Sequence, residues 1–401
     1  MSPQQIIIPG FQFSGIHCGI KDNSRKKDLA LIYSEEPKTL IDGVFTQNRV
    51  CAAPVVLCRD NLKKSSYGQL ILINSGVANA CTGKEGLRDA RSMQSEAARL
   101  FNLAPEAVYV SSTGKIGNTL PMKKIIPGIA KAKKELWDKG FRDSVKAIMT
   151  TDQYPKFEVI RGRVGSKKYT LAVMAKGAGM LRPNMATMLA YVMTDLKFSK
   201  EALHTLFRDA VNVTLNRVTV DGDTSTNDTV LMMANGRADN AEFSATSPFG
   251  KKIKKELTQL LEKMARQITL DGEGATKCCE VKITGAHSEE EAKKMAYAVG
   301  NSPLVKTALF GCDPNWGRIM AALGYSGAAI DPEKISIAIG PYTVVKNGIG
   351  VKSMNPKQVS TYLKKKNVEF LVNCHQGKSS FHVYMSDLTY DYVHLNAEYH
   401  T

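Results

Sequence analysis

The order of apolar and polar positions predicts a chain in which strands and helices alternate. Short apolar runs predict buried strands at 28–33, 54–58, 70–74, 108–111, 169–175, 188–193, 229–234, 279–284, 335–340, 368–372 and 380–386. Longer segments predict helices at 85–102, 123–138, 199–213, 252–269, 288–299 and 356–365. The C-terminal segment 387–399 is apolar and aromatic, so we expect it to be ordered, and its first half is strand-like. The pattern therefore predicts a mixed α and β protein.

Length and hydropathy narrow the class of protein. The chain has 401 residues, enough for two or three domain-sized units, and is 43% hydrophobic and 23% charged, as in an ordinary globular protein. Its longest apolar runs are far shorter than the roughly 20 residues that span a bilayer. The N-terminal residues lack the basic segment and the long apolar segment of a signal peptide. We therefore expect a cytoplasmic protein with no membrane partner.

The eight cysteines do not form a recognisable metal or disulfide pattern. No pair has CxxC spacing, and no histidine stands at zinc-finger spacing from them. The adjacent pair Cys374-His375 is unsuited to placing two ligands on one metal ion. We expect reduced thiols and no metal site or cofactor.

The net charge of +16 raises the alternative of a nucleic-acid-binding protein. The basic residues, however, lie scattered in short runs, and no aromatic residues are interleaved with them. This pattern is more typical of a solvated surface that also attracts anionic substrates. We therefore expect no nucleic-acid partner.

One stretch, at 176–195, carries a distinctive chemical pattern. A glycine-rich turn leads to Pro183, and the small residue Ala186 then precedes Thr187 at the mouth of an apolar run. Attack of the Thr187 hydroxyl on the carbonyl of Ala186 would give an ester that water cleaves, and the new α-amino group would become the base for the same hydroxyl. Such an amine titrates near pH ~8, much closer to neutrality than a lysine. Taken alone, the pattern also fits a threonine that begins a core strand or caps a helix.

Three other segments have the composition of site loops. Thr113 and Gly114 follow a predicted strand, where glycine lets backbone N–H groups turn toward an anion, although a plain strand-to-helix turn also fits. Small and polar residues fill 74–83, and acids and hydroxyls crowd 217–228. The second loop lacks the spacing of an EF-hand and its closing glutamate, so we expect it to be hydrogen-bonded to itself near the site.

Together these segments resemble the ornithine acetyltransferase family, the bifunctional glutamate N-acetyltransferases of arginine biosynthesis, over essentially the whole chain. The resemblance is carried by KGAGM…PNMATML at 176–189, SSTGKIG at 111–117, NRVTVDGDTSTNDT at 216–229, DGEGATK at 271–277, FGCDPNWGRI at 310–319 and DLTYDYVHLNAEY at 387–399. It implies an α+β fold with two packed sheets and outer helices, in an α/β/β/α arrangement of the self-cleaving N-terminal-nucleophile type. It also implies cleavage at Ala186-Thr187 into an α chain, 1–186, and a β chain, 187–401, which share one active site and assemble as an α2β2 heterotetramer.

The resemblance assigns roles to single residues. Thr187 is the expected nucleophile, and Thr113 with Gly114 the expected oxyanion hole. The expected substrate-binding residues, apart from Thr187 itself, are Thr150, Thr151, Lys176, Glu273, Asn396 and Thr401. A cation such as Lys176 suits a carboxylate, and an acid such as Glu273 suits an amino group. The sequence leaves open which of the two adjacent threonines contacts the substrate.

The implied reaction moves the acetyl group of N2-acetylornithine to Thr187 and from there to L-glutamate. The chain departs from the family pattern at Val77, where asparagine is expected, and at Lys115, where an aliphatic residue is usual. Both departures leave the range of acetyl donors open, including whether acetyl-CoA is also used. Two alternatives stay in view: a self-cleaving aminopeptidase with water as the acceptor, and a basic nucleic-acid-binding protein without catalysis.

Overall fold

The computed structural model describes residues 5–180 and 188–398, and its N-terminal part contains two β-sheets. The four-stranded sheet has the order β1 (Phe11–Ile16), β2 (Leu29–Ser34), β4 (Leu70–Val77) and β5 (Val108–Lys115). The five-stranded sheet has the order β3 (Leu40–Phe45), β10 (Thr229–Ala234), β8 (Leu189–Thr194), β7 (Lys167–Lys176) and β6 (Lys156–Val164). Residues from both sides of position 187 therefore form one sheet.

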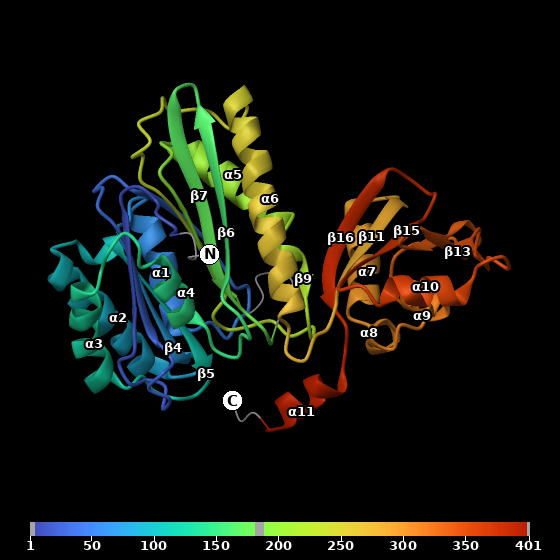
Figure 1. The fold of residues 1–401 in the computed structure, drawn as a ribbon, viewed down its shortest axis with the longest axis horizontal. Coiled ribbons are helices and arrows are strands. Elements are labelled where there is room, and N and C mark those ends of the chain that lie inside the picture. The colour runs from blue at the N-terminus through green and yellow to red at the C-terminus, as the bar shows by residue number, and fades with distance from the viewer. Residues whose placement is uncertain (1–4, 181–187, 399–401) are drawn as a thin grey trace.

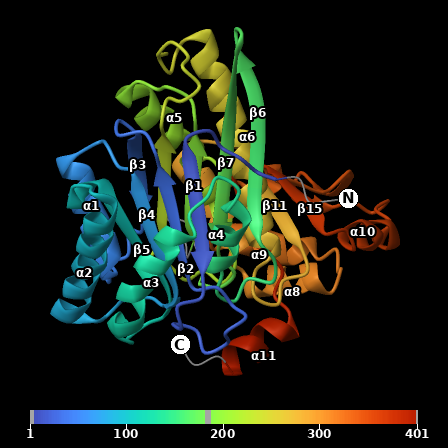
Figure 2. The ribbon, with the colours of Figure 1, turned by 60° about the vertical axis from the view of Figure 1, so that its left-hand side comes forward.

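These two sheets pack face to face with helices outside, as Figures 1 and 2 show. A buried cluster between them joins Ile73 of the first sheet to Met174, Tyr191 and Met233 of the second. Helices α2 (Gly83–Phe101) and α3 (Met122–Lys134) cover the outer face of the four-stranded sheet. Helices α5 (Lys200–Asn212) and α6 (Pro248–Leu270) cover the five-stranded sheet. The expected α/β/β/α arrangement is confirmed.

Two further helices complete this part of the molecule, and one of them corrects a prediction. Helix α4 (Phe141–Ile148) packs its apolar side against β1, β2 and β7. The segment 54–58, predicted as a strand, lies in helix α1 (Ala53–Lys64). All five residues of PVVLC are apolar, so their pattern cannot distinguish a strand from a buried helix. Pro54 lies in the first helical turn, where its missing N–H group would have no helical partner in any case.

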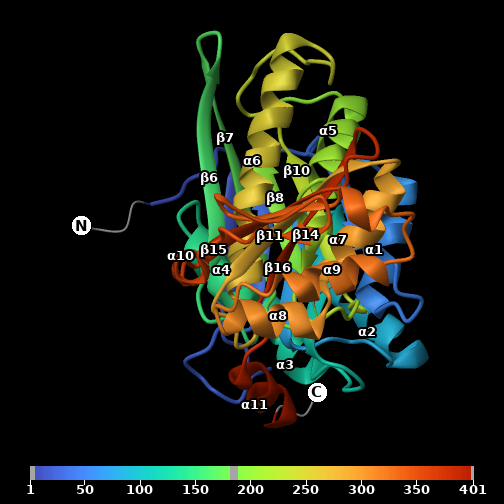
Figure 3. The same cartoon turned by 90° about the vertical axis from the view of Figure 1, so that its right-hand side faces the viewer.

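A third sheet follows in the C-terminal part, which the two-sheet expectation did not include. Its strands are β14 (Ile349–Gly350), β13 (Tyr342–Lys346), β12 (Ser336–Ile339), β15 (Asn367–Asn373), β11 (Cys278–Ala286), β16 (Ser379–Ser386) and β9 (Val218–Thr219), in that order. Its helices are α7 (Glu289–Gly300), α8 (Pro303–Phe310), α9 (Trp316–Gly324) and α10 (Pro356–Leu363), with a core of their own (Figure 3). Because β9 precedes β10 in the chain, the polar loop between them passes from this sheet to the five-stranded one.

The C-terminal segment forms a helix, so its predicted strand-like first half is wrong. Helix α11 (Tyr390–Glu398) begins where the Thr389 hydroxyl accepts a hydrogen bond from the Tyr392 N–H group. None of its residues is buried. Sequence periodicity indicates a helix or a strand only where one face of the element is buried. The alternation of polar and apolar residues near Leu395 does not meet this condition, so it did not indicate the correct structure.

In the described ranges 5–180 and 188–398, no helix is long and apolar enough to cross a membrane. Within the same residues no group of three or more histidine, cysteine, aspartate or glutamate side chains is arranged to hold a metal ion. All eight cysteines are free thiols.

Candidate active site

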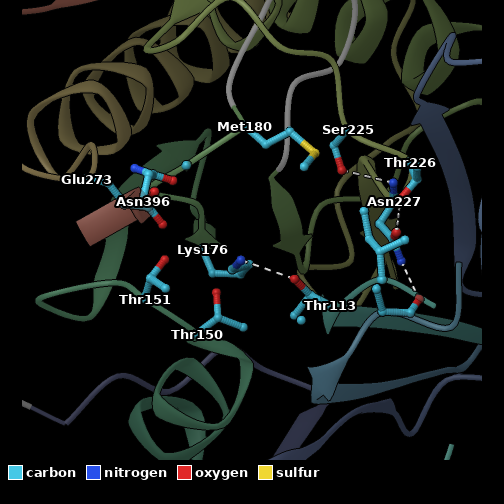
Figure 4. Close-up of a pocket in the computed structure, with 14 residues that line it drawn as sticks. Thr113, Thr150, Thr151, Lys176, Met180, Ser225, Thr226, Asn227, Glu273 and Asn396 are labelled. Carbon is cyan, nitrogen blue, oxygen red and sulfur yellow. Dashed lines mark hydrogen bonds between the residues drawn. The ribbon is translucent and has the colours of Figure 1, made fainter. Parts of the chain in front are cut away.

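A cavity of about 100 Å³ lies where the two packed sheets, the DGEG segment 271–274 and helix α11 meet. Seven residues singled out from the sequence line it: Thr113, Gly114, Thr150, Thr151, Lys176, Glu273 and Asn396. They come from segments up to 283 positions apart in the chain, and Figure 4 shows their side chains around one space. The structure thus brings together every predicted site residue that it describes.

Strand β7 ends at this cavity. Lys176 is the last residue of β7, and it pairs with Leu189, the first residue of the neighbouring strand β8. The connection between these strands contains Ala186 and Thr187, which lie outside the described residues, as does Thr401. The described residues Lys176 and Leu189, on the two sides of this connection, are therefore fixed to each other in the sheet.

Gly114 occupies a position at which no other residue fits. Its φ of +133° lies outside the range that side chains tolerate, and an added Cβ would stand 2.2 Å from the carbonyl carbon of Gly76 on β4. Strand β5 consequently approaches β4 very closely at this point. Thr113 is buried, and its hydroxyl accepts a hydrogen bond from Lys176 Nζ at 3.1 Å. The predicted oxyanion pair thus lies next to the predicted carboxylate-binding cation.

Glu273 reaches the cavity because Gly179 lacks a side chain. A Cβ at Gly179 would stand 2.3 Å from a Glu273 carboxylate oxygen. The Glu273 N–H group also donates to the carbonyl of Ala178 at 2.8 Å. The absence of a side chain at Gly179 therefore makes room for Glu273, so this glycine is required by a close approach as well as by the turn.

The cation Lys176 is held in a low-dielectric setting. The side chain is buried, and burial lowers the pKa of its ammonium group, while the nearby carboxylates Asp152, Glu273 and Asp228 act in the opposite direction. Buried charges in proteins are normally paired with opposite ones. Lys176 is thus a preformed cationic position in the cavity wall, suited to a substrate carboxylate.

Asp152, which sequence reasoning did not select, organises three walls of the cavity. Its Oδ2 accepts the Thr150 N–H group at 2.8 Å, and its Oδ1 accepts the Gly177 N–H group at 2.8 Å. The same Oδ1 accepts a hydrogen bond from Lys156 Nζ at 2.6 Å. Burial alone would raise the pKa of Asp152, but Lys176 and Lys156 outweigh it and hold the pKa well below its usual range.

Lys156 extends this network to the DGEG segment. Its ammonium group also contacts Asp271 Oδ2, and Asp271 Oδ1 accepts the Gln153 N–H group at 3.2 Å. The side chains of Lys156, Asp152 and Asp271 are all inaccessible to solvent in this triad. A sequence signal for it would have been the four-residue spacing of Asp152 and Lys156, but that spacing is common at protein surfaces.

The polar loop 217–228 borders the cavity and is hydrogen-bonded to itself, as predicted. The Asn227 N–H group donates to Ser225 Oγ, and the Thr226 hydroxyl donates to Asn227 Oδ1. Asn227 also donates through Nδ2 to the carbonyls of Ala78 and Ser112, at 2.6 and 2.8 Å. Sequence reasoning placed this loop near the site but missed that Ser225, Thr226 and Asn227 line the cavity.

Helix α11 carries Asn396 to the cavity from the C-terminal end of the chain. The segment before it is fixed to the DGEG region, because Asp387 Oδ1 accepts the N–H groups of Thr276 and Lys277 at 2.8 and 3.0 Å. The Thr389 hydroxyl also donates to the Gly274 carbonyl at 2.7 Å. Asn396 itself donates to the Tyr392 carbonyl, which leaves its amide oxygen available to a ligand.

The two departures from the family pattern lie together beside the site. Val77 and Lys115 are neighbours across strands β4 and β5. Both line a larger cavity of about 730 Å³ that shares Gly114, Thr151 and Glu273 with the first. The two side chains thus share this cavity with Gly114 of the predicted oxyanion pair.

Comparison with known proteins places the chain in a family. The ArgJ family model matches residues 12–401. The arginine biosynthesis bifunctional protein ArgJ of Caldanaerobacter subterraneus is 45% identical over 98% of this chain and 97% of its own length. The protein of the same name from Geobacter sulfurreducens is 43% identical over 98% of this chain and all of its own length. The chain is also similar to the crystal structure of the arginine biosynthesis bifunctional protein ArgJ from Bacillus halodurans. The two are 43% identical, and the match covers 52% of this chain and 98% of the crystallised one with a TM-score of 0.50. The chain therefore belongs to the ArgJ family.

Proposed function

We propose that this protein cleaves itself between Ala186 and Thr187 and then transfers the acetyl group of N2-acetylornithine to L-glutamate. Membership of the ArgJ family makes the chain an acyltransferase of arginine biosynthesis. The observation that carries the finer assignment is the meeting of Thr113, Lys176 and Glu273 in one cavity at the ends of β7 and β8. These residues supply the groups that an acetylated amino acid requires.

Self-cleavage is the first proposed step. The Thr187 hydroxyl attacks the Ala186 carbonyl, the peptide C–N bond breaks, and the hydroxyl proton passes to the departing nitrogen. Water then hydrolyses the resulting ester, which leaves a carboxylate on Ala186 and a free α-amino group on Thr187. Because that amine titrates near neutrality, it is a suitable base for its own hydroxyl.

Acetyl transfer follows by double displacement. The Thr187 hydroxyl attacks the acetyl carbonyl of acetylornithine, the oxyanion is stabilised by Thr113 and Gly114, and ornithine leaves with the proton. The amine of glutamate then attacks the acetyl ester, which gives N-acetylglutamate and restores the hydroxyl. Lys176 is placed to bind the substrate carboxylate, and Glu273 and Asn396 to bind the amino groups. We assign Thr150, Thr151 and Thr401 to substrate binding as well.

The half-length of a crystallised relative supports the cleavage. The chain of the Bacillus halodurans structure aligns along 98% of its length with only 52% of this chain, as one product of a central cut would. Here the products would have 186 and 215 residues. We propose that they assemble as an α2β2 heterotetramer that acts in the cytoplasm. The use of acetyl-CoA as a second donor is a separate activity to be assayed.

The decisive experiment compares the purified protein with its Thr187→Ala variant. Mass spectrometry should find two chains in the wild type, the second beginning Thr-Met-Leu-Ala, and one uncut, inactive chain in the variant. Acetylornithine with glutamate should give N-acetylglutamate, and acetyl-CoA with glutamate tests the second donor. Release of acetate regardless of glutamate would identify a hydrolase instead. An active, uncut wild-type chain would refute the proposal.

A further inference from the structure

Asp228 holds the peptide group that follows the predicted nucleophile. It stands at the end of the polar loop, directly before strand β10. Its Oδ1 accepts the N–H group of Met188 at 3.1 Å, and the next residue, Thr229, donates its N–H group to the Met188 carbonyl at 3.1 Å. The Met188 nitrogen is covalently bonded to residue 187. Asp228 and Thr229 therefore fix both sides of the first residue after the nucleophile.

Asp228 is itself held firmly in place. Its carbonyl accepts the Thr46 N–H group at 3.0 Å, at the end of strand β3. Its side chain is completely buried. The carboxyl group is thus held between β3 and β8, out of contact with solvent.

The Ser225 and Thr46 side chains and the Lys176 charge lower the pKa of the Asp228 carboxyl group, and burial outweighs them. The neighbouring Thr46 hydroxyl donates to the Ser225 carbonyl at 2.6 Å, and Lys176 donates to Thr113. Among residues 5–180 and 188–398 no ion pair includes Asp228. A buried carboxylate in this setting is costly, and burial raises the pKa of Asp228 well above its usual value.

We propose that Asp228 is a positioning residue of the reaction centre, acting through the Met188 amide on the residue that carries the nucleophile. The inference rests on the proposed function of Thr187. A backbone amide next to a nucleophile that must attack two different carbonyls needs a fixed direction. A buried acceptor directly before a strand supplies this.

Strand β8 offers a matched control at its opposite end. Asp195 follows the last residue of β8, and its side chain is nearly buried. Its Oδ1 accepts the Thr170 N–H group at 2.7 Å, and burial raises the pKa of this carboxyl to about 6. Asp195 is thus also a buried carboxyl group that accepts a backbone N–H group, at the other end of β8 and not among the residues that line the cavity.

The experiment measures three quantities for Asp228→Ala, Asp228→Asn, Asp195→Ala and Asp195→Asn: the rate of chain cleavage, kcat and KM for acetyl transfer, and Tm. Asp228→Ala should slow cleavage and lower kcat by about ten- to hundredfold, with little change in KM. This factor corresponds to the free-energy cost of leaving the buried Met188 N–H group without its acceptor. Asp228→Asn keeps an oxygen acceptor for the Met188 N–H group, so it should restore both rates to within a fewfold of wild type. The Asp195 variants should lower Tm without changing either rate.

Three results would overturn the inference. Wild-type cleavage and kcat in Asp228→Ala would show that the Met188 contact is not needed. An Asp228→Asn variant as slow as the alanine variant would show that the acid transfers a proton and does not act by position. Equal loss of rate in Asp195→Ala would show that destabilisation alone is responsible. If the wild-type chain does not cleave, the proposed function fails separately, and the kcat measurement still tests Asp228.

Discussion

Replacing Lys156 with methionine tests whether the buried triad sets the geometry of the active site. Methionine has similar length but cannot pair with Asp152 or Asp271, which lie at 2.6 Å and in direct contact with the lysine ammonium group. All three side chains are inaccessible to solvent. The substitution therefore leaves two carboxyl groups buried near each other without their shared cation.

The size of the expected stability loss in Lys156→Met follows from the burial of these three side chains. Removing one partner of a buried ion pair costs about 3–5 kcal/mol, because an uncompensated charge stays behind. At about 2–4 °C per kcal/mol in a medium-sized domain, Tm should fall by roughly 10 °C. Asp152 also anchors the N–H groups of Thr150 and Gly177, so its displacement should raise KM for acetylornithine as well.

The loss should depend on pH, and its sign can be worked out. In the wild type the pKa of Asp152 is depressed, so its contribution to stability is present above the ordinary carboxyl pKa of about 4 and is lost as the pH falls below it. Without Lys156 the folded-state pKa values of both carboxyls rise, which penalises the folded state as the pH increases. The difference in unfolding free energy between wild type and variant should therefore be large at neutral pH and shrink toward pH ~4.

Denaturant unfolding at several pH values measures this difference, and steady-state assays at neutral pH measure KM. Lys197→Met is the matched control, since this lysine is 52% exposed and lies 3.8 Å from Glu242. A surface pair of this kind contributes about 0–1 kcal/mol. If Lys156→Met unfolds like the control and keeps a normal KM, the triad does not organise the site.

Two further predictions concern the cavity walls. Thr113→Ala should slow both cleavage and acetylation by about 10²–10³-fold, the usual effect of losing one oxyanion donor. Mass spectrometry measures the first rate and product formation the second, and unchanged rates for both steps would contradict the assignment of Thr113. Deleting residues 399–401 should raise KM for acetylornithine while cleavage and Tm stay near wild type, and a normal KM in this truncation would show that the end of the chain takes no part in binding.

The sequence was sufficient to predict most strands and helices, because their apolar runs have a clear length and period. The prediction failed at 54–58, where five apolar residues fit either a strand or a helix and Pro54 in fact begins α1. It failed again in the first half of 387–399, because α11 buries none of its residues and so carries no periodic signal. The third sheet was missed for a different reason. Four of its seven strands were predicted one by one, but their partners are set by long-range pairing such as β11 with β15, and β9 was assigned to the polar loop 217–228.

Chemistry or the family pattern marks several of the residues that line the cavity, such as Thr113, Lys176 and Glu273, and their roles stay predictions. The residues that hold them were not. Asp152, Lys156 and Asp228 look like ordinary surface charges in the sequence, and only the folded chain shows that all three are buried. Whether a charged side chain is buried depends on how the whole chain packs, so it cannot be inferred from the neighbouring residues in the sequence.

The order of strands explains how a chain cut at its centre can remain one protein. In the five-stranded sheet, β10 and β8 from the second half of the chain lie side by side, with β3 on one flank and β7 and β6 on the other, all from the first half. Separating the halves would break the β3–β10 ladder and the β7–β8 ladder, each of six residue pairs. It would also expose the core between the two sheets, to which both halves contribute. The proposed cut lies in the connection between β7 and β8 and removes no strand from either ladder. The two products of the proposed cut would therefore be interlocked halves of one folding unit, and the cavity between the sheets would keep its walls.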